Sequence, residues 1–152
     1  MITVYDAVKF LHVVLAIIAV GFNASYGIWL SRAARDPDHE LHVLRGIKAL
    51  DDRFANPAYA LLLVTGLIMV AISGVRITDF WIAAGLALYA LVVVVGAGLY
   101  TPTLRRQIEV LEVQGPTSPA YQRLATRSRI TGIGLAIPTI IIVFLMVTKP
   151  TL

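Results

Sequence analysis

The residue best placed to do chemistry is a histidine inside a long apolar stretch. His12 belongs to the uncharged run from 10 to 30, where an ionisable side chain is costly and is therefore a functional candidate. On a helix it heads a face of small residues, namely His12, Ala16, Ala19, Asn23 and Gly27. A neutral imidazole can bind a metal, and small neighbours let a flat macrocycle such as haem approach the helix. The alternative is structural: His12 serves as a hydrogen-bond partner between helices.

A haem or copper ion bound by His12 would take a second ligand from elsewhere in the chain. Met69 and Met146 lie toward the same end of their apolar runs, at roughly the depth of His12, so they are the candidates. A methionine in a protein core is more often there for packing. His39 and His42 fall at the other side of a bilayer and cannot reach His12.

The elements that position these residues are four uncharged stretches, each long enough to cross a bilayer as a helix. Hydrophobic residues make up 58% of the 152 positions and charged residues 14%. The stretches predict one all-α domain over residues 1–152, a four-helix transmembrane bundle with up-and-down topology. The helices are expected at about 5–31, 54–75, 79–101 and 128–148.

Basic residues are distributed unequally between the two sides of this bundle. Ten fall in the segments between helices one and two and between helices three and four, and three fall on the other side. The positive-inside rule then places these two segments in the cytoplasm and both termini outside. The net charge of +4 is explained by topology, so no nucleic-acid partner is expected.

The segment between helices one and two has the pattern of a short amphipathic helix in the cytoplasm. Apolar residues recur at helical spacing at Val43, Ile47, Leu50 and Phe54. The charged group Asp51, Asp52 and Arg53 is interpreted as an ion pair or helix cap, in preference to a proton relay. His39 and His42 form a weak metal site at most, and a solvated surface is the favoured interpretation.

Several small features bear on packing. The short turn at 73–79 predicts that helices two and three are antiparallel neighbours. Gly85, Gly96 and Gly98 mark faces where membrane helices approach closely. Pro138 should bend helix four, with the hydroxyl of Thr139 satisfying a freed carbonyl.

Because the chain has no cysteine, thiolate chemistry is excluded.

A set of short motifs resembles a bacterial family of predicted integral membrane proteins, catalogued as domain of unknown function twenty-two sixty-nine. The motifs are 9–13, 56–58 with 65–67, 88–89, 104–107 and 145–150, so the likeness covers nearly the whole chain. The resemblance implies a fold and a location in the bacterial cytoplasmic (inner) membrane. It implies no activity.

A more distant likeness is to the J-type protoporphyrinogen oxidase and the copper-resistance D-type membrane domains. They share a Leu-His pair near the start of helix one, and the oxidase has an ending similar to Pro138-Thr139 and Lys149-Pro150. Because the helix-one histidine of the oxidase is tied to haem b, the resemblance implies haem b at His12. The oxidase also needs a lysine early in helix three, which the stretch 81–86 lacks, so oxidase activity is not expected.

Two classes of function follow. The first is a membrane protein that binds haem b through His12 in a redox or porphyrin-related role, without itself being an enzyme. The second is a non-catalytic membrane module that packs with itself or with a membrane partner through its glycine faces. A small transporter is the weaker third hypothesis, because the chain lacks the broken helix pairs typical of transporters.

Overall fold

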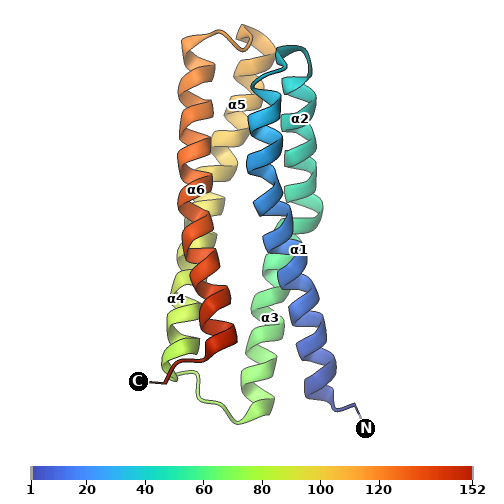
Figure 1. The fold of residues 1–152 in the computed structure, drawn as a ribbon, viewed down its shortest axis with the longest axis vertical. Coiled ribbons are helices and arrows are strands. Elements are labelled where there is room, and N and C mark those ends of the chain that lie inside the picture. The colour runs from blue at the N-terminus through green and yellow to red at the C-terminus, as the bar shows by residue number, and fades with distance from the viewer. Residues whose placement is uncertain (1, 152) are drawn as a thin grey trace.

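The computed structural model describes residues 2–151, and within them all regular structure is helical. The elements are α1 (Val4–Ala33), α2 (Pro37–Leu50), η1 (Asp51–Ala55), α3 (Asn56–Ser73), α4 (Phe80–Val95), η2 (Gly96–Tyr100), α5 (Thr101–Gln114) and α6 (Pro119–Thr148). The segments η1 and η2 are single π-helical turns that join their neighbours without a break. The chain therefore forms four upright columns with up-and-down topology, as predicted (Figure 1).

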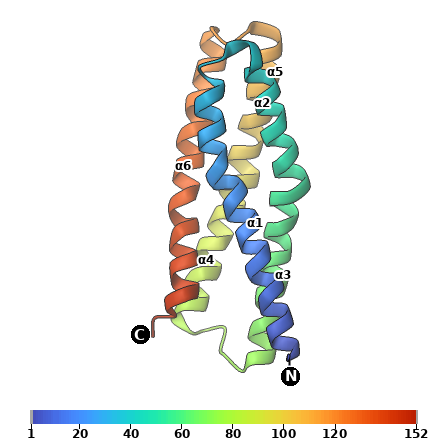
Figure 2. The same ribbon diagram turned by 45° about the vertical axis from the view of Figure 1, so that its right-hand side comes forward.

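The two ends of the bundle differ. Both chain termini and the turn at 74–79 lie at one end, here called the terminal end (Figure 1). The turns at 34–36 and 115–118 lie at the other, called the basic end because most arginines of the chain are near it. The helical columns extend further toward the basic end than the helix ranges that were expected from the apolar stretches. In particular, the amphipathic segment stands upright as α2 and continues the column of α3 (Figures 1 and 2).

Local sequence signals set where the helices begin and end. Thr3 and Asp6 form a capping box at the start of α1, each side chain bonding the backbone of the other. Ser118 caps α6 by accepting a hydrogen bond from the Tyr121 amide at 3.2 Å. At Gly74 the chain leaves α3 with φ of 72°, a conformation that only glycine adopts without strain.

Each of the four columns contains a helix long and apolar enough to cross a membrane. Only 11–17% of the most apolar window of each column is buried within the chain, so the remaining apolar side chains face outward. Such a surface is unfavourable in water and favourable in lipid. The fold is that of an integral membrane protein.

The columns pack as two pairs. Near the terminal end α1 packs on α3 and α4 packs on α6, but no described Cα atom of α3 lies within 8 Å of one in α4. The second and third columns are antiparallel neighbours, as predicted, but they contact each other through α2 and α5 near the basic end, while α3 and α4 remain apart. Small residues explain the pairing, because Ala19 and Ala58 are fully buried between α1 and α3.

The main core lies in the half of the bundle near the basic end. Its most completely buried side chains are Leu44 of α2 and Leu104 of α5, with Tyr26 and Tyr100 beside them. This core joins all four columns, which the half near the terminal end does not do. The basic half therefore holds the two helix pairs together.

One detail of α6 differs from expectation. The helix runs through Pro138 without interruption. Pro138 frees the carbonyl of Gly134, four residues earlier. The Thr139 hydroxyl, however, donates to the Leu135 carbonyl at 2.8 Å and not to that of Gly134. The prediction that the Thr139 hydroxyl satisfies the freed carbonyl is therefore wrong.

Candidate functional sites

His12 lies between α1 and α3 and has a defined hydrogen-bond partner. Its Nδ1 is 2.8 Å from the Thr65 hydroxyl oxygen. The Thr65 hydroxyl donates its only hydrogen to the carbonyl of Leu61 at 2.8 Å, so it accepts from His12. Nδ1 therefore carries the hydrogen, and Nε2 is left with its lone pair free.

The space around the imidazole is shaped by a glycine. A Cβ atom on Gly66 would lie 3.3 Å from Cε1 of His12, so the ring rests against the backbone of α3. Of the small residues on the His12 face, Ala19 is fully buried against α3, whereas Gly27 is exposed. The small residues near His12 thus bring α1 and α3 together.

The two methionines lie in different helix pairs. Met69 is half-buried on α3, one turn beyond Thr65 toward the terminal end. Met146 is on α6, and its methyl group occupies the space that a Cβ on Gly85 of α4 would need. Gly85 is therefore a packing position inside the chain. The structure places His12 and Met69 in one pair of helices and Met146 in the other.

Polar side chains also connect the two pairs near the middle of the bundle. The Asn23 amide donates to the Tyr59 hydroxyl at 3.2 Å, linking α1 with α3. The Tyr89 hydroxyl of α4 donates to the Tyr59 carbonyl at 2.8 Å. The Tyr89 side chain thus bridges α4 and the backbone of α3, although the Cα atoms of the two helices remain apart. Asn23, on the same helical face as His12, thus serves as a hydrogen-bond partner between helices.

The charged group at the π-helical turn η1, midway along the second column, agrees only in part with the prediction of an ion pair or helix cap. Asp52 forms an ion pair with Lys48, one turn earlier. Asp51, by contrast, is only 5% exposed and points into the bundle. Its single side-chain hydrogen bond among residues 2–151 comes from the Asn56 amide at 3.4 Å. Asn56 therefore donates to a buried carboxylate.

The buried face of α2 is also rotated from the expected one. The predicted apolar face contained Val43, Ile47, Leu50 and Phe54. The residues that are actually buried recur as Glu40, Leu44, Ile47, Asp51 and Ala55. Two carboxylates lie on this face, so an apolar pattern in the sequence does not identify it as the buried one.

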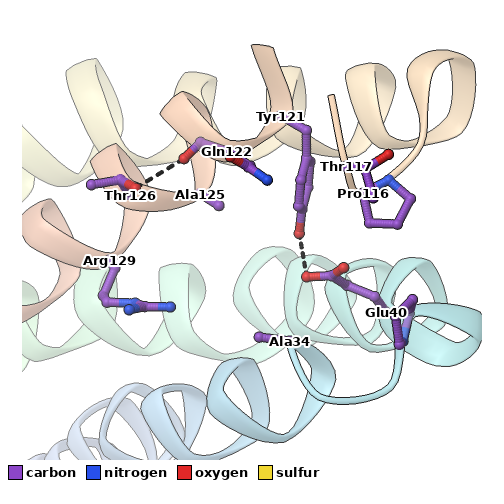
Figure 3. Close-up of a pocket in the computed structure, with 10 residues that line it drawn as sticks. Ala34, Glu40, Pro116, Thr117, Tyr121, Gln122, Ala125, Thr126 and Arg129 are labelled. Carbon is purple, nitrogen blue, oxygen red and sulfur yellow. Dashed lines mark hydrogen bonds between the residues drawn. The ribbon is translucent and has the colours of Figure 1, made fainter. Parts of the chain in front are cut away.

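Glu40 belongs to a buried chain of hydrogen bonds at the basic end, which the sequence did not reveal. The Tyr121 hydroxyl of α6 donates to the Glu40 carboxylate (Figure 3). Gln107 of α5 donates to the Tyr121 oxygen at 3.4 Å and accepts from Ser128 at 2.7 Å. All four side chains are buried, so the network ties α2, α5 and α6 together.

A pocket of about 440 Å³ opens beside this network, at the basic end. Figure 3 shows Tyr121 and Glu40 meeting at one part of its wall, with Arg129 some distance along α6. Because Glu40 and Tyr121 satisfy each other, their polar atoms are engaged in holding helices together. We therefore assign no ligand to this pocket.

His39 is engaged in a surface contact. Its Nδ1 donates to the Asp36 carboxylate at 3.0 Å. This hydrogen bond raises the pKa of His39 and lowers the pKa of Asp36 from their ordinary values. Within residues 2–151 no cluster of three or more His, Cys, Asp or Glu side chains could hold a metal ion. His39 and Asp36 are a solvated pair.

Comparison with known proteins gives one match. The model of the family described as "Predicted integral membrane protein (DUF2269)" matches residues 6–150. No curated protein matches the chain, and no solved structure does. The match spans all four columns, and both His12 and Asp51 lie within it.

Proposed function

The chain belongs to this family of predicted integral membrane proteins, and on that premise we propose that it binds one haem b through His12 in a membrane redox or porphyrin-related role. The protein is not itself an enzyme in this proposal. The basic end faces the cytoplasm of a bacterium and both termini face outward across the inner membrane, as the positive-inside rule requires.

The observation that carries the proposal is the 2.8 Å contact between His12 Nδ1 and the Thr65 hydroxyl, from which we infer that Nε2 has its lone pair available. Ligating histidines commonly donate their other ring N–H to a fixed acceptor, which sets the tautomer and the orientation of the ring. Thr65 supplies that acceptor at 2.8 Å. Because Nδ1 is engaged, the nitrogen that remains is the one an iron atom would need.

The residues have distinct roles in this proposal. His12 would be an axial ligand, and Thr65 would hold its ring in place. Met69 is the favoured second ligand, because it lies on the helix that packs against α1, whereas Met146 packs against Gly85. A bound haem would supply one-electron chemistry.

We test the proposal with ultraviolet-visible spectra of the protein purified in mild detergent from cells supplied with a haem precursor. A Soret band at one haem per chain is expected, and His12→Ala should abolish it. His12→Asn is the matched variant: its amide nitrogen replaces Nδ1 and can still donate to Thr65, but no atom replaces Nε2. We expect His12→Asn to lose the band while keeping wild-type stability within about 1 kcal/mol.

The same spectra can contradict the proposal. A colourless wild-type protein, or a Soret band retained in His12→Asn, would rule out the ligand role. Metal analysis separates iron from copper, and stoichiometric copper without haem would also count against haem. A colourless protein without bound metal would leave His12 as an interhelical hydrogen-bond partner only.

A second function, a packing module without a cofactor, is favoured by one observation. Gly98 is exposed, and no described atom lies within 4 Å of a Cβ built on it. Exposed Val94 lies one turn away on the same side of the column. A glycine that serves no contact within its own chain leaves room for a helix of another copy or of a membrane partner.

Gly98→Leu tests this second function. If two copies pack through this face, the substitution should convert the assembled form to the monomer in detergent, as measured by light scattering. Gly21→Leu, at a glycine that is also exposed and open but lies on α1, is the control and should leave the assembly intact. A wild-type protein that is monomeric at all concentrations contradicts self-association.

A further inference from the structure

Two buried polar side chains in the bundle interior lack the partners that burial normally demands. Asp51 is 5% exposed, and among residues 2–151 no Lys, Arg or His nitrogen lies within 4.0 Å of its carboxylate. Tyr26 is 3% exposed, and its hydroxyl has no hydrogen-bond partner within the described chain. Buried polar groups are nearly always paired, so each of these calls for an explanation.

The register of α1 against the second column brings Asp51 and Tyr26 to the same level. His12 of α1 lies beside Thr65 of α3, and the two columns run in opposite directions. Tyr26 follows His12 by the same number of residues as Asp51 precedes Thr65, so Tyr26 and Asp51 lie at the same level. The rings of Phe22 and Phe54, at 5.8 Å between centroids, confirm that this register holds one turn away. Both Tyr26 and Asp51 are on the buried faces of their helices, so they face the same interior.

At this level of the bundle, the second and third columns each contain a π-helical turn in place of regular α-helix. The π-helical turn η1 begins at Asp51, and η2 ends at Tyr100, which is buried beside Tyr26. Single π-helical turns inside long helices occur often at functional sites. Titratable and charged side chains around Asp51 come from five elements: Tyr26 of α1, Lys48 of α2, Asp52 of η1, Tyr59 of α3 and Tyr100 of η2.

The charges in this group do not neutralise Asp51. The only cation, Lys48, is paired with Asp52. Asp52 itself is a second negative charge beside Asp51, which adds repulsion. A carboxylate held in a low-dielectric interior with one long amide hydrogen bond is strongly disfavoured, and such a group normally takes up a proton instead.

We propose that Asp51 carries a proton in the folded protein and that Asp51 and Tyr26 together form an interior proton-binding site. The neutral carboxyl accepts from Asn56 through its carbonyl oxygen, and its O–H group lies at the same level as the unpaired Tyr26 hydroxyl without a direct hydrogen bond between the two in this structure. On release the O–H bond of the carboxyl breaks, the proton passes to water at the basic end, and a carboxylate remains. An ionisable group of this kind inside a membrane protein is a place where the protein takes up or releases protons.

Infrared spectroscopy of the full-length protein in detergent tests this site. A protonated carboxyl has a carbonyl stretching band that a carboxylate lacks. We expect the band at neutral pH, and ¹³C labelling of aspartate should shift it, which distinguishes Asp51 from glutamates such as Glu40. The band should vanish in Asp51→Asn and persist in Asp52→Asn, the matched variant at the neighbouring paired carboxylate.

Tyr26→Phe keeps the carboxyl and removes the hydroxyl, so it should change the frequency of the band without abolishing it. This measurement, like the isotope shift, does not depend on whether Asp51→Asn folds. The proposal is overturned if no aspartate-sensitive band is present at neutral pH. It is equally overturned if the band survives in folded Asp51→Asn, or if Tyr26→Phe leaves its frequency unchanged.

Discussion

Leu104→Ala is expected to destabilise the protein by about 3 kcal/mol, within the range for removal of a large buried apolar side chain. Leu104 is 0% exposed and lies in the core where α2 and α5 meet. Alanine would leave a cavity there that the surrounding helices cannot readily fill. Since this core is what joins the two helix pairs, the loss should affect the whole bundle.

The measurement is unfolding in mixed micelles, followed by circular dichroism as the fraction of denaturing detergent rises. The control on the same helix is Val113→Ala. Val113 is 84% exposed, so its substitution should change the free energy of unfolding by less than about 0.5 kcal/mol. Equal effects of the two substitutions would mean that the core of the basic half does not hold the bundle together.

The membrane-spanning columns could be predicted from the sequence because a bilayer imposes a simple requirement. A helix that crosses lipid must be apolar over about 20 residues, whatever its neighbours are. The up-and-down order follows, since each span has to return the chain to the other side. The family model and the four helices agree with these expectations.

The sequence pattern could not show which columns pack closely against each other. A short turn between α3 and α4 favours neighbours, but close packing depends on which faces carry small residues. Ala19 and Ala58 bring α1 to α3, and Gly85 admits Met146 between α4 and α6. These contacts involve residues far apart in the sequence, so no local pattern indicates them.

The contacts of the interior polar residues could likewise not be predicted from the local sequence. His12 stood out because it is ionisable within an apolar run, but its partner Thr65 did not, since a helical threonine commonly bonds its own backbone. The burial of Glu40 and Asp51 was not predicted, because charged residues usually lie at the surface and Asp51 was interpreted as part of an ion pair or helix cap. The partner of Glu40 is 81 residues away, and its burial could be inferred only once α6 was placed.

That distant contact between Glu40 and Tyr121 leads to the second large expected effect. Tyr121→Phe removes the hydroxyl that donates to the buried Glu40 carboxylate and that accepts from Gln107. A buried charged group left without its donor is expected to destabilise the protein by about 3 kcal/mol. Glu40→Leu should be milder, because the Tyr121 hydroxyl then still has Gln107 beside it.

A double variant makes this prediction specific to the hydrogen bond. In Glu40→Leu with Tyr121→Phe both polar groups are gone, and replacing both partners by apolar groups can be nearly neutral. We therefore expect the double variant to be more stable than Tyr121→Phe alone, by the same micelle unfolding assay. If the two effects instead simply add, Glu40 and Tyr121 stabilise the helices independently, and the buried network does not act as a unit.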